Sequence, residues 1–247
     1  MSSFEVDGGS SGNAGPPSAY NSYKLLITSN SFFVFASLCY VVASILDYQE
    51  NLKPVDEQGV VKLAYLLKIV GAISFIVVGG VDFYNTAKKL HILLILAGFF
   101  GTISAATSET NLQASLVCNL LSVHFYLLES LQWIYGHVFQ TKLDKDDSRT
   151  KSLLLAEIGD FCFMLGAFMD VILSYYYFTK TDEPPEGPGI LVSTQSVTTS
   201  QVEISSSVFW LIASMVAITV SCKTGKQGFE GVSQSTKLSS NIAGNLA

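Results

Sequence analysis

Hydrophobic residues along the chain gather into six blocks, each long enough or nearly long enough to cross a bilayer as a helix. A hydrocarbon core of about 30 Å needs roughly 20 mostly apolar helical residues. All six prolines lie outside these blocks. The pattern therefore predicts an all-α, multi-pass transmembrane helical bundle of six spans, of which the third and sixth are the shortest. The spans are expected at about residues 31–46, 63–83, 90–106, 112–138, 153–178 and 208–222.

The positions of Lys and Arg give a second view of the same topology, because cytoplasmic loops of membrane proteins collect these residues. If the two termini and the second and fourth connections share one side, that side holds ten of the fourteen basic residues and the other side holds four. Four or five spans would remove this asymmetry. It predicts six spans, with both termini in the cytoplasm.

The segments outside the spans are polar. Residues 1–22 are rich in Gly, Ser and Pro and lack the basic and apolar regions of a signal peptide, so we expect a disordered cytoplasmic tail. The bundle then occupies 23–223, and the Ser-rich residues 224–247 form a second disordered cytoplasmic tail. The longest outer loop, 179–207, begins with turn-forming residues and continues with β-branched ones, which indicates either a short hairpin or a solvated connector.

Composition narrows the class of protein. Hydrophobic residues make up 49% of the chain and charged residues 14%, against roughly 25% charged in an average soluble domain. This ratio excludes an ordinary soluble enzyme and makes the lipid bilayer the main partner. A net charge of -6 argues against nucleic acid as a partner, since phosphate binding needs a cluster of Lys and Arg.

The chain offers no recognisable cofactor or metal motif. Its four cysteines, which include no CxxC pair, fall inside or at the end of the expected spans, and its three histidines are scattered. Neither a zinc site nor a disulfide framework can be argued from this spacing, so we expect no metal and no cofactor.

Small residues recur in adjacent pairs near the middle of five of the six spans. Such residues let helix backbones approach closely in lipid, where no hydrophobic force drives association. In the third span, small residues also recur every fourth position. The pattern indicates either a compact bundle or an oligomer contact. The helix-packing candidates are Ala36, Ser37, Gly79, Gly80, Ala97, Gly101, Ala105, Gly166, Ala167, Ala213 and Ser214.

Two of these spans also show a family resemblance. The segments FFVFASLCYVVASILDY (Phe32 to Tyr48) and DFCFMLGAFMDVILSYYY (Asp160 to Tyr177) resemble helices of YrhK-like small membrane modules, in which a Phe-rich start precedes a Gly/Ser pair. That family is of unknown function and the resemblance covers single helices. It implies a membrane protein and no particular chemistry.

Polar residues inside the spans are the candidates for chemistry, because an ionisable group at the centre of a bilayer costs about 2.5–3.5 kcal/mol or more on insertion scales. In the fourth span, polar and aromatic residues recur every three or four positions and so share one helical face. They are Ser115, Asn119, Ser122, Tyr126, Glu129 and Trp133. The fifth span carries a second such face with Glu157, Asp160, Asp170 and Ser174.

If these two faces meet, Glu129, Asp160 and Asp170 share one interior with Asn119. Carboxylates in such a place can relay a proton or coordinate a cation stripped of water. The alternative is that they are hydrogen-bond donors and acceptors that hold the helices together.

Two functions follow from these patterns. A non-catalytic scaffold or assembly subunit, packing against itself or other membrane proteins, explains the proline-free helices and small-residue faces. A small proton- or cation-coupled transporter or channel explains the intramembrane acids. An enzyme is not expected, because the sequences EIGD (157–160) and GGVD (79–82) both miss the Gly-x-Gly-Asp pattern and no other catalytic motif is present. Of the two functions, we expect the non-catalytic scaffold or assembly subunit.

Overall fold

The computed structural model describes residues 19–53, 62–86, 91–108, 110–140, 147–180 and 197–244, with the backbone alone for 19–22, 86, 136–140, 147–153, 197 and 224–244. Within these ranges all regular structure is helical, in six helices without a strand, which confirms the predicted all-α class. The helices are α1 (Ala19–Asn51), α2 (Lys62–Thr86), α3 (Ile92–Thr107), α4 (Leu112–Gln140), α5 (Asp147–Lys180) and α6 (Val197–Gly244).

Four of these helices are long and apolar enough to cross a membrane. The qualifying segments are Tyr23–Asn51, Lys62–Asn85, Leu112–Tyr135 and Thr198–Lys223. Helix α3 is apolar but has 16 residues, about 24 Å at 1.5 Å per residue. Helix α5 is long but carries acidic residues along its length. These features are those of a helical membrane protein.

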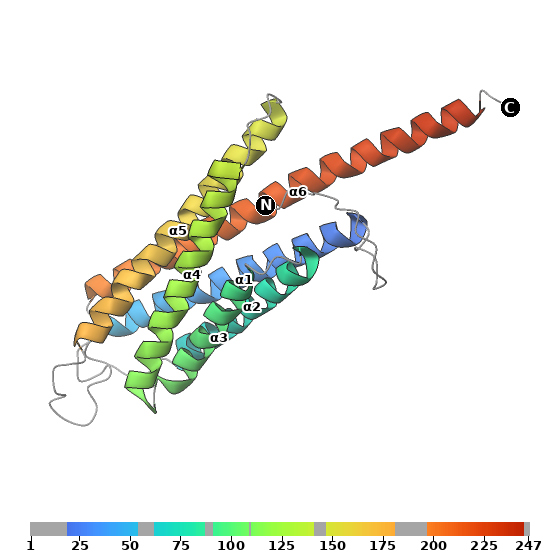
Figure 1. The fold of residues 1–247 in the computed structure, drawn as a ribbon. Coiled ribbons are helices and arrows are strands. Elements are labelled where there is room, and N and C mark those ends of the chain that lie inside the picture. The colour runs from blue at the N-terminus through green and yellow to red at the C-terminus, as the bar shows by residue number, and fades with distance from the viewer. Residues whose placement is uncertain are drawn as a thin grey trace.

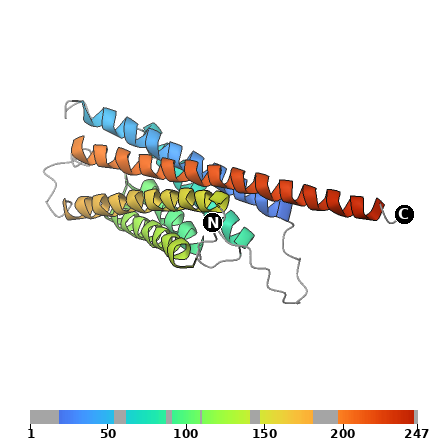
Figure 2. The ribbon, with the colours of Figure 1, turned by 90° about the horizontal axis from the view of Figure 1, so that it is seen from above.

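The six helices are arranged as a ring. Each helix packs against its neighbours in the chain, and α6 returns to pack against α1. Figures 1 and 2 show α1 and α6 side by side in both views, with the far end of α6 extending beyond the other helices. Because the first and last helices close the ring, all six share one enclosed interior.

Aromatic side chains fill the middle of that interior. The Trp210 ring centroid lies 4.6 Å from that of Tyr126, 4.9 Å from Phe163 and 5.1 Å from Phe75. Phe33 lies 5.6 Å from both Phe75 and Phe163. Aromatic pairs at such distances and steep angles pack favourably. We call these five residues the aromatic core; they come from α1, α2, α4, α5 and α6.

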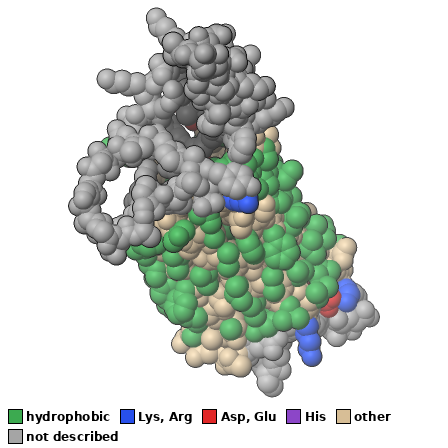
Figure 3. All heavy atoms as spheres, turned by 90° about the vertical axis from the view of Figure 1, so that its right-hand side faces the viewer, with side chains coloured by type: hydrophobic (Ala, Val, Ile, Leu, Met, Phe, Trp, Pro, Cys, Tyr) green, Lys and Arg blue, Asp and Glu red, His purple; other side chains and the backbone are tan. Residues whose placement is uncertain are grey.

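The outside of the ring is apolar. Large hydrophobic side chains are exposed on every helix, for example Phe35 on α1, Val70 on α2 and Phe168 on α5. On the face drawn in Figure 3, hydrophobic side chains form a broad area and charged side chains lie at its margins. A surface of this kind matches the hydrocarbon of a bilayer better than water.

The ends of the helices differ from expectation at three places. Helix α1 begins at Ala19, inside the predicted tail 1–22, and residues 1–18 lie outside the described ranges. Helix α6 begins at Val197, so the outer loop expected at 179–207, whether a hairpin or a solvated connector, is wrong from that residue on; 181–196 are not described. Here the tertiary contacts of α6 override the β-propensity of its first residues.

Helix α6 also continues to Gly244, where we expected a disordered tail from Thr224. No proline follows Pro188 in the chain. A helix without a proline can continue its backbone hydrogen bonds past the last residue that packs on a neighbour.

Candidate functional site

Most of the predicted small residues lie inside the chain, between its own helices. Ala36, Ala97 and Ala167 are fully buried, and Ser37, Ala213 and Ser214 are nearly so. A Cβ added at Gly166 would meet the Trp210 ring, and one at Gly101 would lie 3.1 Å from Ser122 Oγ. Ala105 keeps partial exposure. The small-residue faces are therefore used for packing within the bundle.

The adjacent glycines of α2 differ sharply in their surroundings. A Cβ at Gly79 would lie 2.8 Å from Ile95 Cγ1 and 3.1 Å from the His91 carbonyl oxygen, so α3 approaches α2 at this point. A Cβ at Gly80 would have no neighbour within 4 Å. One residue of the pair is needed for close packing and the other is not.

The contact between α1 and α6 is a ladder of small polar residues, which sequence reasoning missed. Asn30 Nδ2 donates to Ser221 Oγ (2.7 Å), the hydroxyls of Ser44 and Ser207 lie 3.0 Å apart, and Asn51 Nδ2 donates to Ser200 Oγ (2.8 Å). Between these rungs, Ser37 Oγ donates to the Trp210 carbonyl oxygen (3.3 Å). The rungs run in opposite directions along the two helices, which are therefore antiparallel.

The signal for this ladder was present in the sequence as a seven-residue repeat. In α1 the repeat comprises Asn30, Ser37, Ser44 and Asn51, and in α6 it comprises Ser200, Ser207, Ser214 and Ser221. A seven-residue spacing keeps one stripe of each helix facing its partner, as in a left-handed coiled coil. Adjacent small pairs do not reveal it, because the members of the repeat are seven residues apart, over 30–51 in α1 and 200–221 in α6.

A group of charged residues ties three helices together near one end of the ring. Lys68 Nζ on α2 lies 2.7 Å from Asp47 Oδ2 on α1 and 2.8 Å from Glu203 Oε1 on α6. All three side chains are less than one third exposed. We call Asp47, Lys68 and Glu203 the Lys68 cluster. The sequence pattern placed Lys68 in the second span and Glu203 in the outer loop 179–207, and so did not pair them.

The predicted site residues Asp170 and Asn119 lie toward the same end. Asp170 Oδ1 accepts a hydrogen bond from Ser206 Oγ on α6 (2.5 Å), and Lys68 and Glu203 act on it electrostatically. Asn119 Nδ2 on α4 donates to Ser174 Oγ on α5 (2.7 Å). Both residues therefore join neighbouring helices.

Glu129 lies toward the other end and is fully buried. Its Oε1 accepts a hydrogen bond from Trp133 Nε1 (2.9 Å) and lies 3.5 Å from His91 Nδ1, while its Oε2 has no hydrogen-bond partner among the described residues. Asp82 of α2 is an electrostatic neighbour of both Glu129 and His91. We call Asp82, His91, Glu129 and Trp133 the His91 cluster.

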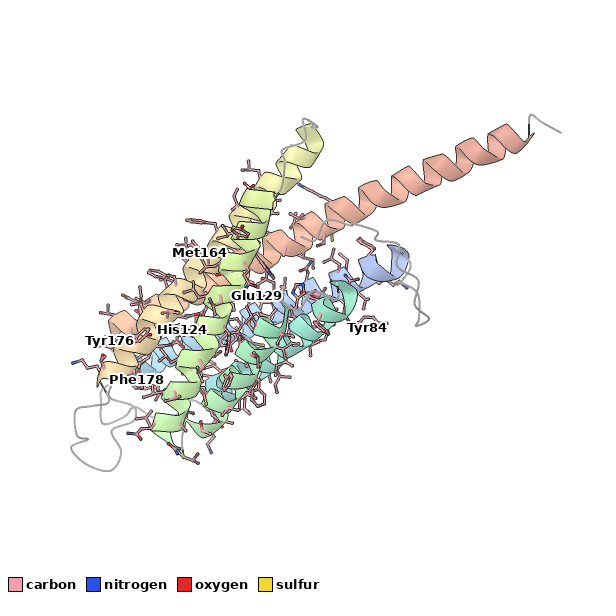
Figure 4. All side chains as sticks on the ribbon, in the orientation of Figure 1. Tyr84, His124, Glu129, Met164, Tyr176 and Phe178 are labelled. Carbon is pink, nitrogen blue, oxygen red and sulfur yellow. The ribbon has the colours of Figure 1, made fainter. Side chains whose placement is uncertain are left out.

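Figure 4 labels Glu129 on α4 at the side facing α1 to α3, and His124 on the same helix toward α5. The His124 ring packs against Tyr175 of α5 with centroids 5.6 Å apart, and its Nδ1 lies 2.6 Å from the Leu120 carbonyl oxygen. His124 is thus a packed histidine outside the His91 cluster.

The structure divides the single polar interior that we expected into two. Asp170 belongs with the Lys68 cluster and Glu129 with the His91 cluster, and the aromatic core lies between them. Asp160, buried on α5, precedes Asp170 by ten residues, or about 15 Å along a helix. The sequence pattern places these acids on inward helix faces, but it does not give their positions along the axis of the bundle.

The two clusters differ in what they can do chemically. The Lys68 cluster pairs its charges and ties helices together. The His91 cluster holds a carboxylate with an unused oxygen beside an imidazole, a combination that can bind a proton. Among the described residues, no group of three His, Cys, Asp or Glu side chains is placed to hold a metal ion.

Comparison with protein-family models, curated proteins and solved structures finds no match to the chain. The resemblance of its helices to YrhK-like modules therefore stays a prediction.

Proposed function

We propose that the protein is a non-catalytic membrane scaffold or assembly subunit. The observation that carries this proposal is the packing of the interior. The space enclosed by Phe33, Phe75, Val78, Leu94, Trp133 and Phe163 has no room for a water molecule. A solute crossing the ring would have to displace these side chains, so the packing favours a rigid support over a passage.

A scaffold of this kind would meet its partners with its outer surface, because its small residues are used within the chain. The outer surface has a shallow apolar groove of about 350 Å³ between α5 and α6. The groove is lined by Leu155, Leu211, Ile212, Met215, Val216 and Thr219. Its size and apolar lining suit side chains of a transmembrane helix, from a second copy of the chain or from another membrane protein.

The alternative is a small proton- or cation-coupled transporter or channel. It is favoured by one observation, the full burial of Glu129 with one carboxylate oxygen that has no hydrogen-bond partner in the described part of the chain. A carboxylate at membrane depth is costly, and in transport proteins such groups mark ion and proton pathways.

Flux measurements separate the two functions. The purified protein is reconstituted into liposomes, and proton, sodium and potassium flux is recorded for wild type and for Glu129→Gln, which keeps the side-chain size and removes the charge. A scaffold gives no flux above protein-free liposomes with either variant. Flux that the wild type shows and Glu129→Gln loses would contradict the scaffold and support the alternative.

Crosslinking tests the outer surface. A photoreactive amino acid replaces Met215 in the groove or, as a matched control, Ile73 on α2, which is exposed to a similar extent. In native membranes we expect a protein adduct of one defined mass from position 215 and lipid adducts from position 73. Lipid adducts alone from both positions would contradict a partner helix in the groove.

A further inference from the structure

Glu129 is the residue of the His91 cluster whose charge needs a partner. Its side chain is fully buried, one oxygen has a single neutral donor in Trp133, and the other has none among the described residues. An ionised carboxylate in such surroundings is unfavourable unless it is paired, and otherwise it takes up a proton.

The groups that face Glu129 come from several elements. His91, at the start of α3, is the basic group within reach, 3.5 Å away. Asp82 on α2 adds negative charge, and Asp160 is the buried acid of α5 at this end. Lys24 of α1 and Lys223 of α6 also belong to this end but are exposed. The imidazole is thus the group able to offset the charge on Glu129.

We propose that Glu129 and His91 together form a binding site for one exchangeable proton. When the proton is on Glu129, both groups are neutral; when it is on His91, the two form an ion pair. Either arrangement avoids an isolated buried charge, so the proton is shared by the pair.

The proton exchanges with water from one end of the ring. The His91 side chain is 13% exposed whereas Glu129 is fully buried, so His91 connects the carboxylate to the surface. On the inner side of the site, Trp133 borders the enclosed space that cannot hold water. The site is therefore open to water on the His91 side and closed toward the aromatic core. This inference goes beyond the proposed function, since a scaffold and a transporter could both contain such a site.

The protein carries its own reporter for this proton. Trp133 donates directly to Glu129 Oε1, and the chain has one other tryptophan, Trp210. In a Trp210→Phe variant, Trp133 emission should change with pH in one sigmoidal step. Adding Glu129→Gln, which still accepts the Trp133 hydrogen bond, should abolish that step. An unchanged step in Glu129→Gln would overturn the proposal.

The contribution of His91 is tested in the same background. His91→Gln removes one of the two groups that share the proton. The Trp133 step should therefore change its midpoint or disappear. A step that keeps its midpoint would overturn the part assigned to His91.

Two further measurements distinguish proton binding from a general change in the fold. In Trp133→Phe combined with Asp170→Asn, which removes the carboxyl group beside Trp210, the remaining Trp210 should show no step at the same midpoint, and a common step would overturn the proposal. In the wild type, a hydrophobic carbodiimide, which adds to protonated carboxyl groups, should label Glu129 less as the pH rises through that midpoint. Labelling that does not depend on pH would count equally against the site.

Discussion

At the scale of single residues, small side chains matter only where another helix comes close. Gly79 and Gly80 are adjacent glycines of α2, but α3 approaches only Gly79. The sequence could predict that such pairs pack helices, because glycine in a membrane helix has that general use. It could not predict which member does so, because this depends on the rotation of α2 about its axis.

This difference gives the first prediction. Gly79→Ala should lower the free energy of unfolding by about 1–3 kcal/mol, the usual cost of overpacking, because the new methyl group meets Ile95 and backbone atoms of α3. Gly80→Ala, the matched control, should change it by less than about 0.5 kcal/mol. Reversible unfolding in mixed micelles measures both. Equal losses from the two variants would contradict the assigned rotation of α2.

The second prediction concerns the Lys68 cluster. Lys68→Met leaves Asp47 and Glu203 facing each other without a cation, and should cost about 2 kcal/mol at pH 7, below the 3–5 kcal/mol of a fully buried pair, because these side chains are partly exposed. Unfolding curves of the wild type and the variant at pH 7 measure the loss.

The matched control removes all three charges. Asp47→Asn, Lys68→Met and Glu203→Gln combined should recover most of the stability that Lys68→Met alone loses. A triple variant as unstable as the single one would mean that packing of the Lys68 stem, and not the balance of charge, sets the cost.

At the scale of helices, the pattern of apolar blocks in the sequence correctly predicted that six segments exist and that each is a helix. The six blocks correspond to six helices, because a long apolar run in a chain of this composition has few alternatives. The helix ends were less predictable. The β-branched residues before Val208 joined α6, since its contacts with α1 extend to Ser200.

The α1–α6 ladder leads to the third prediction. In a background lacking the four native cysteines, Ser44→Cys with Ser207→Cys should form a disulfide, because the two hydroxyl oxygens lie 3.0 Å apart. Ser44→Cys with Ser214→Cys is the control, with the second cysteine displaced by about 10.5 Å along α6. The mass after alkylation, with and without reductant, distinguishes bridged from free thiols. Bridging in the control pair alone would contradict the register of the ladder.

At the scale of the whole molecule, the closed ring explains why the candidate site was only partly predictable. Sequence spacing placed Glu129 and Asp170 on inward faces, and both are directed inward. Their division into two clusters depends on how far each helix is shifted along its neighbours. It also depends on His91 and Glu203, residues at helix ends whose partners are distant in sequence.

The fourth prediction concerns orientation. The excess of Lys and Arg on one side predicts both termini in the cytoplasm, and if all six helices cross the membrane, both ends lie on the same side. A reporter active only in the cytoplasm and fused after Ala247 should be active, and one inserted at Gly187 should be inactive. A reporter found outside the cytoplasm when fused after Ala247 would contradict six crossings with this orientation.

The hydrogen bonds that close the ring also set an order of assembly. Asn30 and Ser221 are 191 positions apart, and Ser44 and Ser207 are 163 apart. During synthesis α1 is therefore complete long before its partner helix exists, with its row of serine and asparagine side chains in lipid or against a temporary neighbour. Contacts between distant parts of a chain form late and slowly. A ribosome-bound chain that ends before α6 should thus be the state most easily captured by membrane chaperones.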